Sequence, residues 1–388
     1  MGKLDNATFL QGDAKEQLQS LPEESIQTAV TSPPYWGLRD YDAEGQLGLE
    51  DTPKEYVDNL VSVFREVKRA LRPDGTFWLN IGDSYYNHRP GGDALVEQSV
   101  ASSDQDLPDS CPRRARKIDG LKEKDLVGIP WRVAFALQED GWYLRSDIIW
   151  NKPAPMPESV KDRPTSSHEH IFLLTKNKNY YYDHEAIKEP TVTDETRRMA
   201  IKDSFGSHSS GDDREAQNGN PYMRGAPKKN KRDVWEVSTK PSGFAHFAVY
   251  PLELVEPCVK AGTSAFGQCV ECGSPYERVL EEDKVEGSDK KKFTESKFQN
   301  AGGLRGCSND HLGTTSETVG WKKTCGCDMD ETEPQTVLDP FSGAATTGIA
   351  ALKNGRKYVG VEINEDYIEL SKERIREHNE VPANHSFW

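Results

Sequence analysis

A stiff, polar turn near the start of the chain carries the side chains best suited to chemistry. The turn, Ser32-Pro33-Pro34-Tyr35, follows an apolar run over residues 26–30 that predicts a buried strand. Its two prolines lack a backbone N–H, so the segment can neither extend a sheet nor begin a helix in its middle. The Ser32 hydroxyl and the Pro33 carbonyl are acceptors, and the Tyr35 ring, with Trp36 beside it, offers an aromatic face. The turn suits a flat ligand with an amino group, although a purely structural proline turn fits these residues equally well.

A second turn, near the C-terminus, has the composition of a nucleoside-binding loop. Residues 336–338 predict a strand, and residues 339–348 are mostly small and lead into a helix. The next predicted strand, residues 358–361, ends at Glu362, about 20 residues after Gly343, as expected of an acid that binds ribose hydroxyls. The stretch lacks the dinucleotide fingerprint G-x-G-x-x-G and the Walker motif. It therefore predicts a nucleoside-binding β-α-β unit.

Alternating strand and helix patterns must position the two turns. Strands are predicted over residues 8–12 (ending beside Asp13), 76–81, 143–150 and 169–175, and helices over 56–71, 125–139 and from Pro251 onward. The first helix is expected to end before the break at Pro73-Asp74-Gly75. This alternation predicts an α/β fold with a doubly wound, mostly parallel sheet. Ligands of such sheets bind beyond the carboxyl ends of the strands, where both turns would lie.

Composition narrows the class of protein. The 388 residues allow two domains or one large α/β domain with insertions. No apolar run of about 18 residues and no apolar N-terminal signal region occurs, which predicts a cytoplasmic protein. Seven cysteines, an odd number without a signal, argue against a disulfide framework.

The net charge of -15 would disfavour a nucleic-acid partner, but local patches rather than net charge decide binding. Two basic patches are candidates for phosphate contacts: Arg113, Arg114, Arg116 and Lys117, and Arg224, Lys228, Lys229, Lys231 and Arg232. Either patch could instead be a solvated loop.

The cysteines suggest a metal site. The pairs Cys269-x-x-Cys272 and Cys325-x-Cys327 could supply four thiolates to a structural zinc ion, with Cys307 or His311 able to replace one ligand. Reduced, unliganded surface cysteines are the alternative. Cys258 follows Pro257 within an apolar helical pattern and is expected to be a core residue rather than a nucleophile.

Together, the motifs resemble the amino-group DNA methyltransferases that use S-adenosylmethionine. The matching residues are Ser32-Pro33-Pro34-Tyr35, Asp339-Pro340-Phe341, Gly343, Thr346-Thr347, Glu362 and the segments 150–153, 157–164 and 246–251. With the catalytic loop first and the cofactor loop near the C-terminus, the order is similar to the circularly permuted β class. The chain departs from the family at Ala344-Ala345, where Ser-Gly is usual, so a methyl group is added where the backbone would approach the cofactor.

The resemblance implies a class I methyltransferase fold and roles for particular residues. Asp13 would accept from the adenine amino group of the cofactor, Glu362 would hold the ribose hydroxyls, and Phe341 with the Gly343 backbone would line the methionine moiety. Asp339 and Thr346 belong to the same cofactor loop, and Phe247 to the cofactor-contacting entry of the helix after Pro251.

The same resemblance implies catalysis by Ser32, Pro33, Pro34 and Tyr35 on a base flipped out of double-stranded DNA, with Tyr35 and Trp36 stacking on it. Arg113, Arg114, Lys228, Lys229 and Arg232 would contact the DNA. Serine before Pro-Pro-Tyr favours the N4 amine of cytosine, whereas aspartate or asparagine usually accompanies adenine N6, which stays an alternative. An RNA or protein methyltransferase and a non-catalytic DNA-binding homologue are further alternatives. A cognate restriction endonuclease is a conceivable partner.

The predicted organisation has five parts. Residues 1–190 are predicted to form the catalytic half, with a mobile loop over 87–118, and residues 191–233 a target-recognition insertion. Residues 234–265 are predicted to form the cofactor-side helix, and residues 266–332 a cysteine-pair insertion resembling a zinc ribbon. Residues 333–388 are predicted to form the cofactor-binding half.

Overall fold

A computed structural model describes residues 3–38, 43, 45–86, 118, 120–190, 228–239, 249–284 and 314–380. The chain forms two compact units. The larger comprises Met1–Ala186, Arg232–Tyr276 and Lys323–Trp388, and the smaller Ile187–Lys231 and Glu277–Lys322.

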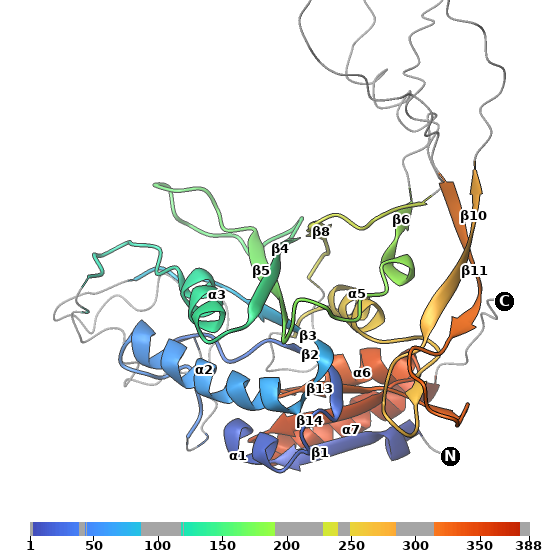
Figure 1. The fold of residues 1–388 in the computed structure, drawn as a ribbon. Coiled ribbons are helices and arrows are strands. Elements are labelled where there is room, and N and C mark those ends of the chain that lie inside the picture. Colours follow the sequence, from blue (N-terminus) through green and yellow to red (C-terminus); the bar gives the residue numbers. More distant parts are fainter. Residues whose placement is uncertain are drawn as a thin grey trace, which may run out of the picture. The chain divides into compact units, whose positions relative to one another are not determined.

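The larger unit is organised around an eight-stranded sheet (Figure 1). In spatial order the strands are β1 (Ala7–Gln11), β14 (Lys357–Glu362), β13 (Thr336–Asp339), β2 (Ile26–Thr31), β3 (Leu71–Ile81), β5 (His168–Thr175), β4 (Tyr143–Asn151) and β8 (Val234–Glu236). Every neighbouring pair is parallel except the two that involve β5. The predicted doubly wound, mostly parallel sheet is confirmed.

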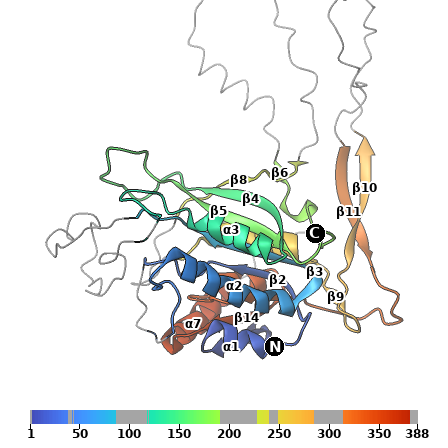
Figure 2. The same cartoon turned by 60° about the vertical axis from the view of Figure 1, so that its left-hand side comes forward.

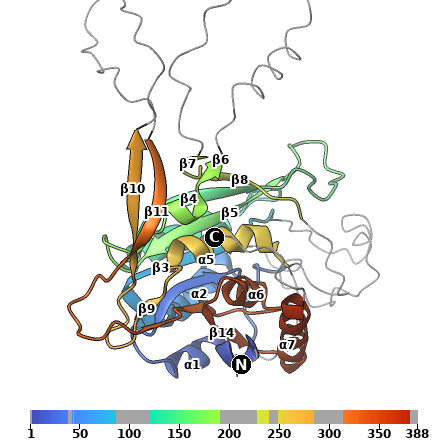
Figure 3. The ribbon, with the colours of Figure 1, turned by 90° about the vertical axis from the view of Figure 1, so that its right-hand side faces the viewer.

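Helices cover both faces of this sheet. On one face, α1 (Ala14–Gln19), α2 (Pro53–Ala70) and α3 (Ile129–Glu139) pack in series (Figure 2). On the other, α5 (Leu252–Gly262), α6 (Thr346–Lys353) and α7 (Glu365–Glu380) do the same (Figure 3). The crossover from β2 uses α2 and that from β13 uses α6, so the two adjacent strands lead to opposite faces. This arrangement creates a topological switch point between them, which is where such sheets bind ligands.

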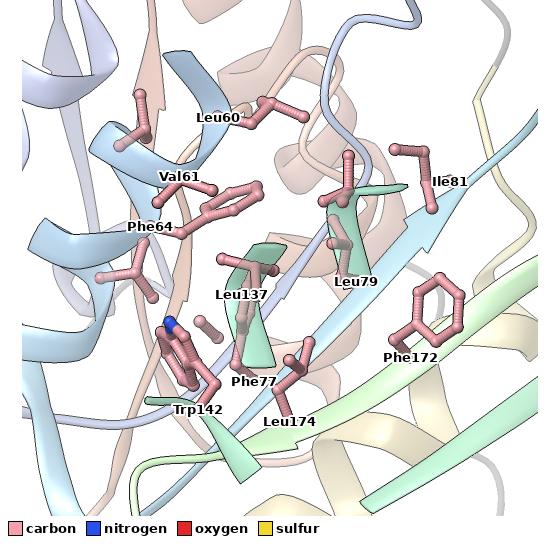
Figure 4. Close-up of a cluster of buried hydrophobic side chains, with 14 of the residues drawn as sticks. Leu60, Val61, Phe64, Phe77, Leu79, Ile81, Leu137, Trp142, Phe172 and Leu174 are labelled. Atoms are coloured by element: carbon pink, nitrogen blue, oxygen red, sulfur yellow. The ribbon is translucent and has the colours of Figure 1, made fainter. Parts of the chain in front are cut away.

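The core between the sheet and the helices α2 and α3 combines aliphatic side chains with several aromatic ones (Figure 4). Phe64 of α2 lies 4.9 Å from Phe77 of β3, and Phe77 lies 5.4 Å from Trp142, measured between ring centroids. All three side chains are buried. Helix α2 is fixed at its start by a capping box between Thr52 and Glu55. The helix that follows the Ser-Pro-Pro-Tyr turn is therefore held firmly on the sheet.

Two predicted boundaries differ from the structure for local reasons. The helix expected from residue 125 begins at Ile129, because Gly128 adopts a left-handed φ of 76° and Pro130 occupies the first turn. The break expected at Pro73-Asp74-Gly75 is an irregularity inside β3: the register with β2 passes from Leu71 directly to Thr76.

Several short elements complete the two units. The larger contains the 3-10 turn η1 (Lys3–Asn6) and the pair β9 (Gln268–Cys269) and β12 (Thr332–Glu333). In the smaller, β6 (Glu189–Pro190) pairs with β7 (Lys228–Lys229), and β10 (Glu277–Lys284) forms a hairpin with β11 (Thr314–Lys322). The 3-10 turn η4 (Glu185–Ile187) lies where the chain passes from one unit to the other. Among the described helices, none is long and apolar enough to cross a membrane. The predicted loop over 87–118 and most of the predicted target-recognition insertion lie outside the described residues.

Candidate active site

One edge of the sheet gathers polar residues from seven strands. The parallel strands β1, β14, β13, β2, β3 and β4 all end at this edge, and the antiparallel β5 begins there. The residues placed there are Asp13, Glu362, Asp339, Ser32, Asn80, Lys152 and Glu169. Four of these seven, Asp13, Glu362, Asp339 and Ser32, were predicted as site residues from the sequence. Asn80 and Glu169 were not, nor was any role for Lys152.

The Ser-Pro-Pro-Tyr turn is anchored from behind. The Tyr56 hydroxyl donates to the Pro34 carbonyl at 2.7 Å, and the Trp36 indole N–H donates to the Glu50 carbonyl at 2.9 Å. Trp36 is only 1% exposed and belongs to the hydrophobic core. The prediction that Trp36 stacks on the substrate is therefore wrong, because its ring is needed to hold the turn and has no surface to offer.

Ser32 and Tyr35 belong to a hydrogen-bonded cluster with two residues from other strands. The Ser32 hydroxyl donates to the Tyr35 hydroxyl at 3.3 Å, which donates to Oε2 of Glu169 at 2.7 Å. The Asn80 amide Nδ2 lies 3.3 Å from Ser32 Oγ and 3.0 Å from both the Tyr35 hydroxyl and Glu169 Oε2. Lys152 forms an ion pair with the other oxygen of Glu169. The hydroxyl donors thus point in one direction, from Ser32 to Glu169.

The surroundings of Tyr35 keep its phenol protonated. Its ring packs so closely on Gly82 that a Cβ at that position would lie 2.7 Å from a ring carbon. Burial, and then the negative charge of Glu169, raise the pKa of Tyr35 well above its ordinary value. At neutral pH this hydroxyl is therefore a donor to Glu169.

A second network joins the two turns through Asp339. This fully buried carboxylate accepts from the Thr31 hydroxyl at 2.6 Å, from the Tyr250 hydroxyl at 3.0 Å and from the Phe341 N–H at 3.1 Å. Burial raises the pKa of Asp339, and hydrogen bonds from Thr31 and Thr347 oppose that rise. Since Thr31 immediately precedes Ser32, Asp339 fixes the spacing between the Ser-Pro-Pro-Tyr turn and the turn around Gly343.

The cofactor turn holds an acidic group beside open space. Glu362 accepts from the Gly343 N–H at 2.8 Å and from the Asn364 N–H at 3.0 Å, and burial raises its pKa. A Cβ built on Gly343, whose φ is 49°, would meet nothing within 4 Å. The turn therefore leaves room for a ligand whose hydroxyls could reach Glu362. Phe341 at its entrance packs edge-on against Phe64, with ring centroids 6.3 Å apart.

Two further residues predicted to bind the cofactor, Asp13 and Thr346, lie at the starts of helices α1 and α6. Asp13 caps α1 by accepting from the Glu16 N–H at 3.0 Å, and the neighbouring Gly12 N–H donates to the Glu362 carbonyl at 3.0 Å. Asp13 and Glu362 therefore end adjacent strands. Thr346 begins α6 and is 5% exposed, and its hydroxyl has no hydrogen-bond partner among the described residues.

The departure from the family pattern has a structural consequence at Ala345. This residue caps α6 with φ 54° and ψ 39°, a left-handed conformation that favours glycine, and it is fully buried. The methyl group of Ala345 therefore packs inside the protein and does not face the open space beside Gly343.

The remaining substrate candidates lie in several places. Arg113, Arg114 and Phe247 fall outside the described residues. In the smaller unit Lys228 is exposed, whereas Lys229 pairs with Glu189 at 3.3 Å and is partly neutralised. Arg232 is exposed in the larger unit. A role for these residues in DNA binding stays a prediction.

The cysteines divide as the sequence predicted. Cys258 is buried in α5 with its thiol 3.6 Å from the Leu254 carbonyl, which confirms a core position. The sulfur atoms of Cys269, Cys272, Cys325 and Cys327 all lie within 4.8 Å of one another. Cys307 and His311 lie outside the described residues.

Sequence reasoning missed Asn80 and Glu169 for a common reason. Asn80 is a polar residue near the end of an otherwise apolar predicted strand, and Glu169 opens the strand over 169–175. Both positions are the strand ends at which functional groups of α/β sheets gather. That signal was present, but only the pairing of β3 with β5 shows that the two side chains meet.

Comparisons with known proteins agree with this geometry. The family model N6_N4_Mtase, described as DNA methylase, matches residues 26–270 and 329–373. The chain is 38% identical to the Type II methyltransferase M.Cfr9I of Citrobacter freundii over 96% of its own length and 89% of that protein. It is also 38% identical to the Type II methyltransferase M.SmaI of Serratia marcescens, over 96% of this chain and 91% of that one.

Among solved structures, the PvuII DNA methyltransferase (cytosine-N4-specific) aligns with a TM-score of 0.51 at 17% identity. The alignment covers 98% of this chain and 88% of the other. The likeness supports a class I methyltransferase fold, as the sequence predicted.

Proposed function

Because the chain belongs to the DNA methylase family, we propose that it transfers a methyl group from S-adenosylmethionine to the N4 amine of cytosine at a specific DNA site. The observation that carries the proposal is the adjacency of two turns of complementary chemistry. Thr31, next to the acceptor Ser32, is hydrogen-bonded to Asp339, which opens the turn containing Gly343 and leading to Glu362. A site for an amine and a site for a nucleoside cofactor are thereby held side by side.

The residues of the second turn fit the cofactor. Glu362, oriented by two backbone N–H groups, would accept from its ribose hydroxyls, and Asp13 on the next strand from its adenine amine. Phe341 and the open side of Gly343 would line its methionine end. Asp339 has no exposed surface, so we assign it the positioning of the turn rather than a direct contact. When bound, S-adenosylmethionine supplies an electrophilic methyl group on its sulfonium.

The first turn would activate the amine. The lone pair of an exocyclic amine is delocalised into the base, which makes the nitrogen a poor nucleophile. If its two protons are donated to Ser32 Oγ and the Pro33 carbonyl, the nitrogen moves towards tetrahedral geometry and its lone pair becomes available. The Pro34 carbonyl is already bonded to Tyr56, which holds the turn in place for this task.

The oriented donors offer a route for the surplus proton. Methyl transfer leaves the amine with one proton too many. Ser32 Oγ would accept it while passing its own proton to the Tyr35 oxygen, and the phenol proton would move to Glu169 Oε2. Charge balances because the product amine becomes neutral and Glu169 becomes a carboxylic acid. Lys152, paired with the other oxygen of Glu169, would hold that carboxylate in place beside Tyr35.

The target must leave the duplex before it can reach Ser32, since an amine inside a base pair is inaccessible. Tyr35 is the aromatic residue of the turn that remains half-buried rather than fully enclosed, so it would stack on the flipped base. The chain order, with the catalytic turn before the cofactor turn, supports the permuted β class. The named relatives, matched over nearly their whole length, support a place in a restriction-modification system, with a cognate endonuclease as partner.

The proposal is tested by incubating the protein with labelled S-adenosylmethionine and unmethylated genomic DNA, followed by mass spectrometry of the nucleosides. We expect N4-methylcytosine, reduced about 1,000-fold in Ser32→Ala with cofactor affinity retained. Ser62→Ala serves as the matched control, because Ser62 bonds only to the Asn59 carbonyl within α2 in the described structure. N6-methyladenine would keep the mechanism and overturn the choice of base. The absence of any methylated nucleoside would overturn the function.

A further inference from the structure

The four clustered cysteines lie at the opposite edge of the sheet from the active site. Arg72, the second residue of β3, donates from Nη1 to the Cys272 carbonyl at 3.2 Å. Asn80 near the other end of this 11-residue strand belongs to the catalytic cluster. At about 3.3 Å per residue, the two sites are separated by most of the length of β3, roughly 25 Å.

The cluster has the dimensions of a tetrahedral metal site. Four thiolates about 2.3 Å from a central zinc ion lie about 3.8 Å from one another. The four sulfur atoms observed all lie within 4.8 Å of one another. All four residues are free thiols rather than disulfides.

The backbone around the first pair is preformed. The Gly273 N–H donates to the Cys269 carbonyl at 2.8 Å, and the Cys269 N–H donates to the Ser274 carbonyl at 2.9 Å. Gly273 has a φ of 70°, and a Cβ there would lie 2.4 Å from Arg72 Nη1. This tight turn brings Cys269 and Cys272 to one side of the chain.

The second pair is tied to the first by independent contacts. The Thr324 hydroxyl donates to the Pro275 carbonyl at 2.6 Å, and β12 pairs Thr332 with Cys269. Lys323 donates to the carbonyls of Cys327 and Met329, which folds the chain after the second pair. Contacts that do not involve the sulfur atoms therefore bring the two cysteine pairs together.

We propose that Cys269, Cys272, Cys325 and Cys327 bind one structural zinc ion. Four thiolates with no open position are the ligand set of a closed, non-catalytic zinc site. The position agrees with this role, since Tyr276 leads directly into β10 and β11 leads directly back to Lys323. The ion would join the segment around Cys269 and Cys272 to the segment around Cys325 and Cys327, and Arg72 would link the first of these to the start of β3.

The test is the metal content of the purified full-length chain, measured by inductively coupled plasma mass spectrometry after growth with zinc sulfate. We expect one zinc per chain, lost in Cys269→Ser and in Cys325→Ser. Cys258→Ala is the matched control and should keep its zinc, because Cys258 lies in α5 away from the cluster. Zinc retained by both serine variants, or a wild type without zinc, would overturn the proposal.

A second measurement avoids variants that fail to fold. X-ray absorption at the zinc edge of the wild type should show four sulfur neighbours at about 2.3 Å. A shell of nitrogen or oxygen, iron with inorganic sulfide in place of zinc, or disulfides found by mass spectrometry would each contradict the site. Neither measurement depends on methyl transfer, so the zinc site and the proposed function can fail separately.

Discussion

Polar groups gather at both edges of the sheet, but they are brought together in different ways. At the carboxyl edge, Ser32, Asn80, Lys152 and Glu169 come from four separate strand ends and meet through hydrogen bonds. At the amino edge, the four sulfur atoms come from two short pairs that the chain brings close on its own. The first edge depends on the main sheet, whereas the second depends on local turns and on a few contacts between two segments outside that sheet.

This difference separates activity from stability. Changes at the carboxyl edge should alter the reaction more than the fold, because Ser32, Tyr35 and Glu169 are only partly buried and lie at the ends of strands. Changes at the amino edge should lower stability and leave the chemistry nearly unaffected, because most of β3 lies between the two. Four predictions, in decreasing size of effect, test that separation.

Glu169→Gln should have the largest effect of the four changes, a loss of methyl transfer. It keeps the shape of the side chain but removes the final proton acceptor, so we expect methyl transfer to fall about 1,000-fold. Cofactor affinity should stay within a factor of two in equilibrium titration. Glu66→Gln, which removes an acid paired with Arg69 on α2, is the control and should keep full activity. An active Glu169→Gln enzyme would exclude the proton route.

Zinc removal should affect stability instead. An ion that binds only the folded chain stabilises it by about 3 kcal/mol at a free concentration 100 times its dissociation constant. A chelator should therefore lower the free energy of unfolding by about that amount, measured by denaturant titration. Methyl transfer by the chain that remains folded should stay unchanged. Equal loss of activity and stability would show that the two edges are coupled.

Tyr35→Phe should separate the contribution of the Tyr35 hydroxyl from that of its ring at the carboxyl edge. The variant keeps the ring that packs on Gly82 and removes only the hydroxyl between Ser32 and Glu169. Because a water molecule can partly replace the hydroxyl, we expect a loss of about tenfold, or about 1.4 kcal/mol. Tyr35→Ala should lose considerably more, since the stacking surface goes too. Equal losses in the two variants would mean that the ring contributes nothing.

Ala345→Gly should have the smallest effect of the four changes, and it should stabilise the fold rather than weaken it. Glycine relieves a left-handed conformation that costs an alanine about 1 kcal/mol, so the free energy of unfolding should rise by about that amount. Ala350→Gly, within the same helix α6, should instead lower it. Cofactor affinity should change little, because the Ala345 methyl group is fully buried. A less stable Ala345→Gly variant would contradict the assignment of strain.

The sequence by itself determined those features that are local. Each of these features can be recognised within a few residues of sequence. They are the prolines of the Ser32 turn, the small residues around Gly343, Glu362 at the end of a strand and the two cysteine pairs. The alternation of strands and helices also predicted the doubly wound sheet, because each element must bury one apolar face. For the same reason the core position of Cys258 could be predicted from its helical pattern.

Only the tertiary structure decided which of these residues meet and which are enclosed. Trp36, an aromatic residue beside the catalytic turn, is in the core because Glu50 and α2 close over it. Asp339 is sealed between Thr31 and Tyr250, so it positions the turn. Glu169 reaches Tyr35 because β5 runs antiparallel to β3, which places the first residues of one strand beside the last of the other. The pairing of strands far apart in the chain depends on packing across the whole sheet, and the pattern within one segment does not show which residues become its partners.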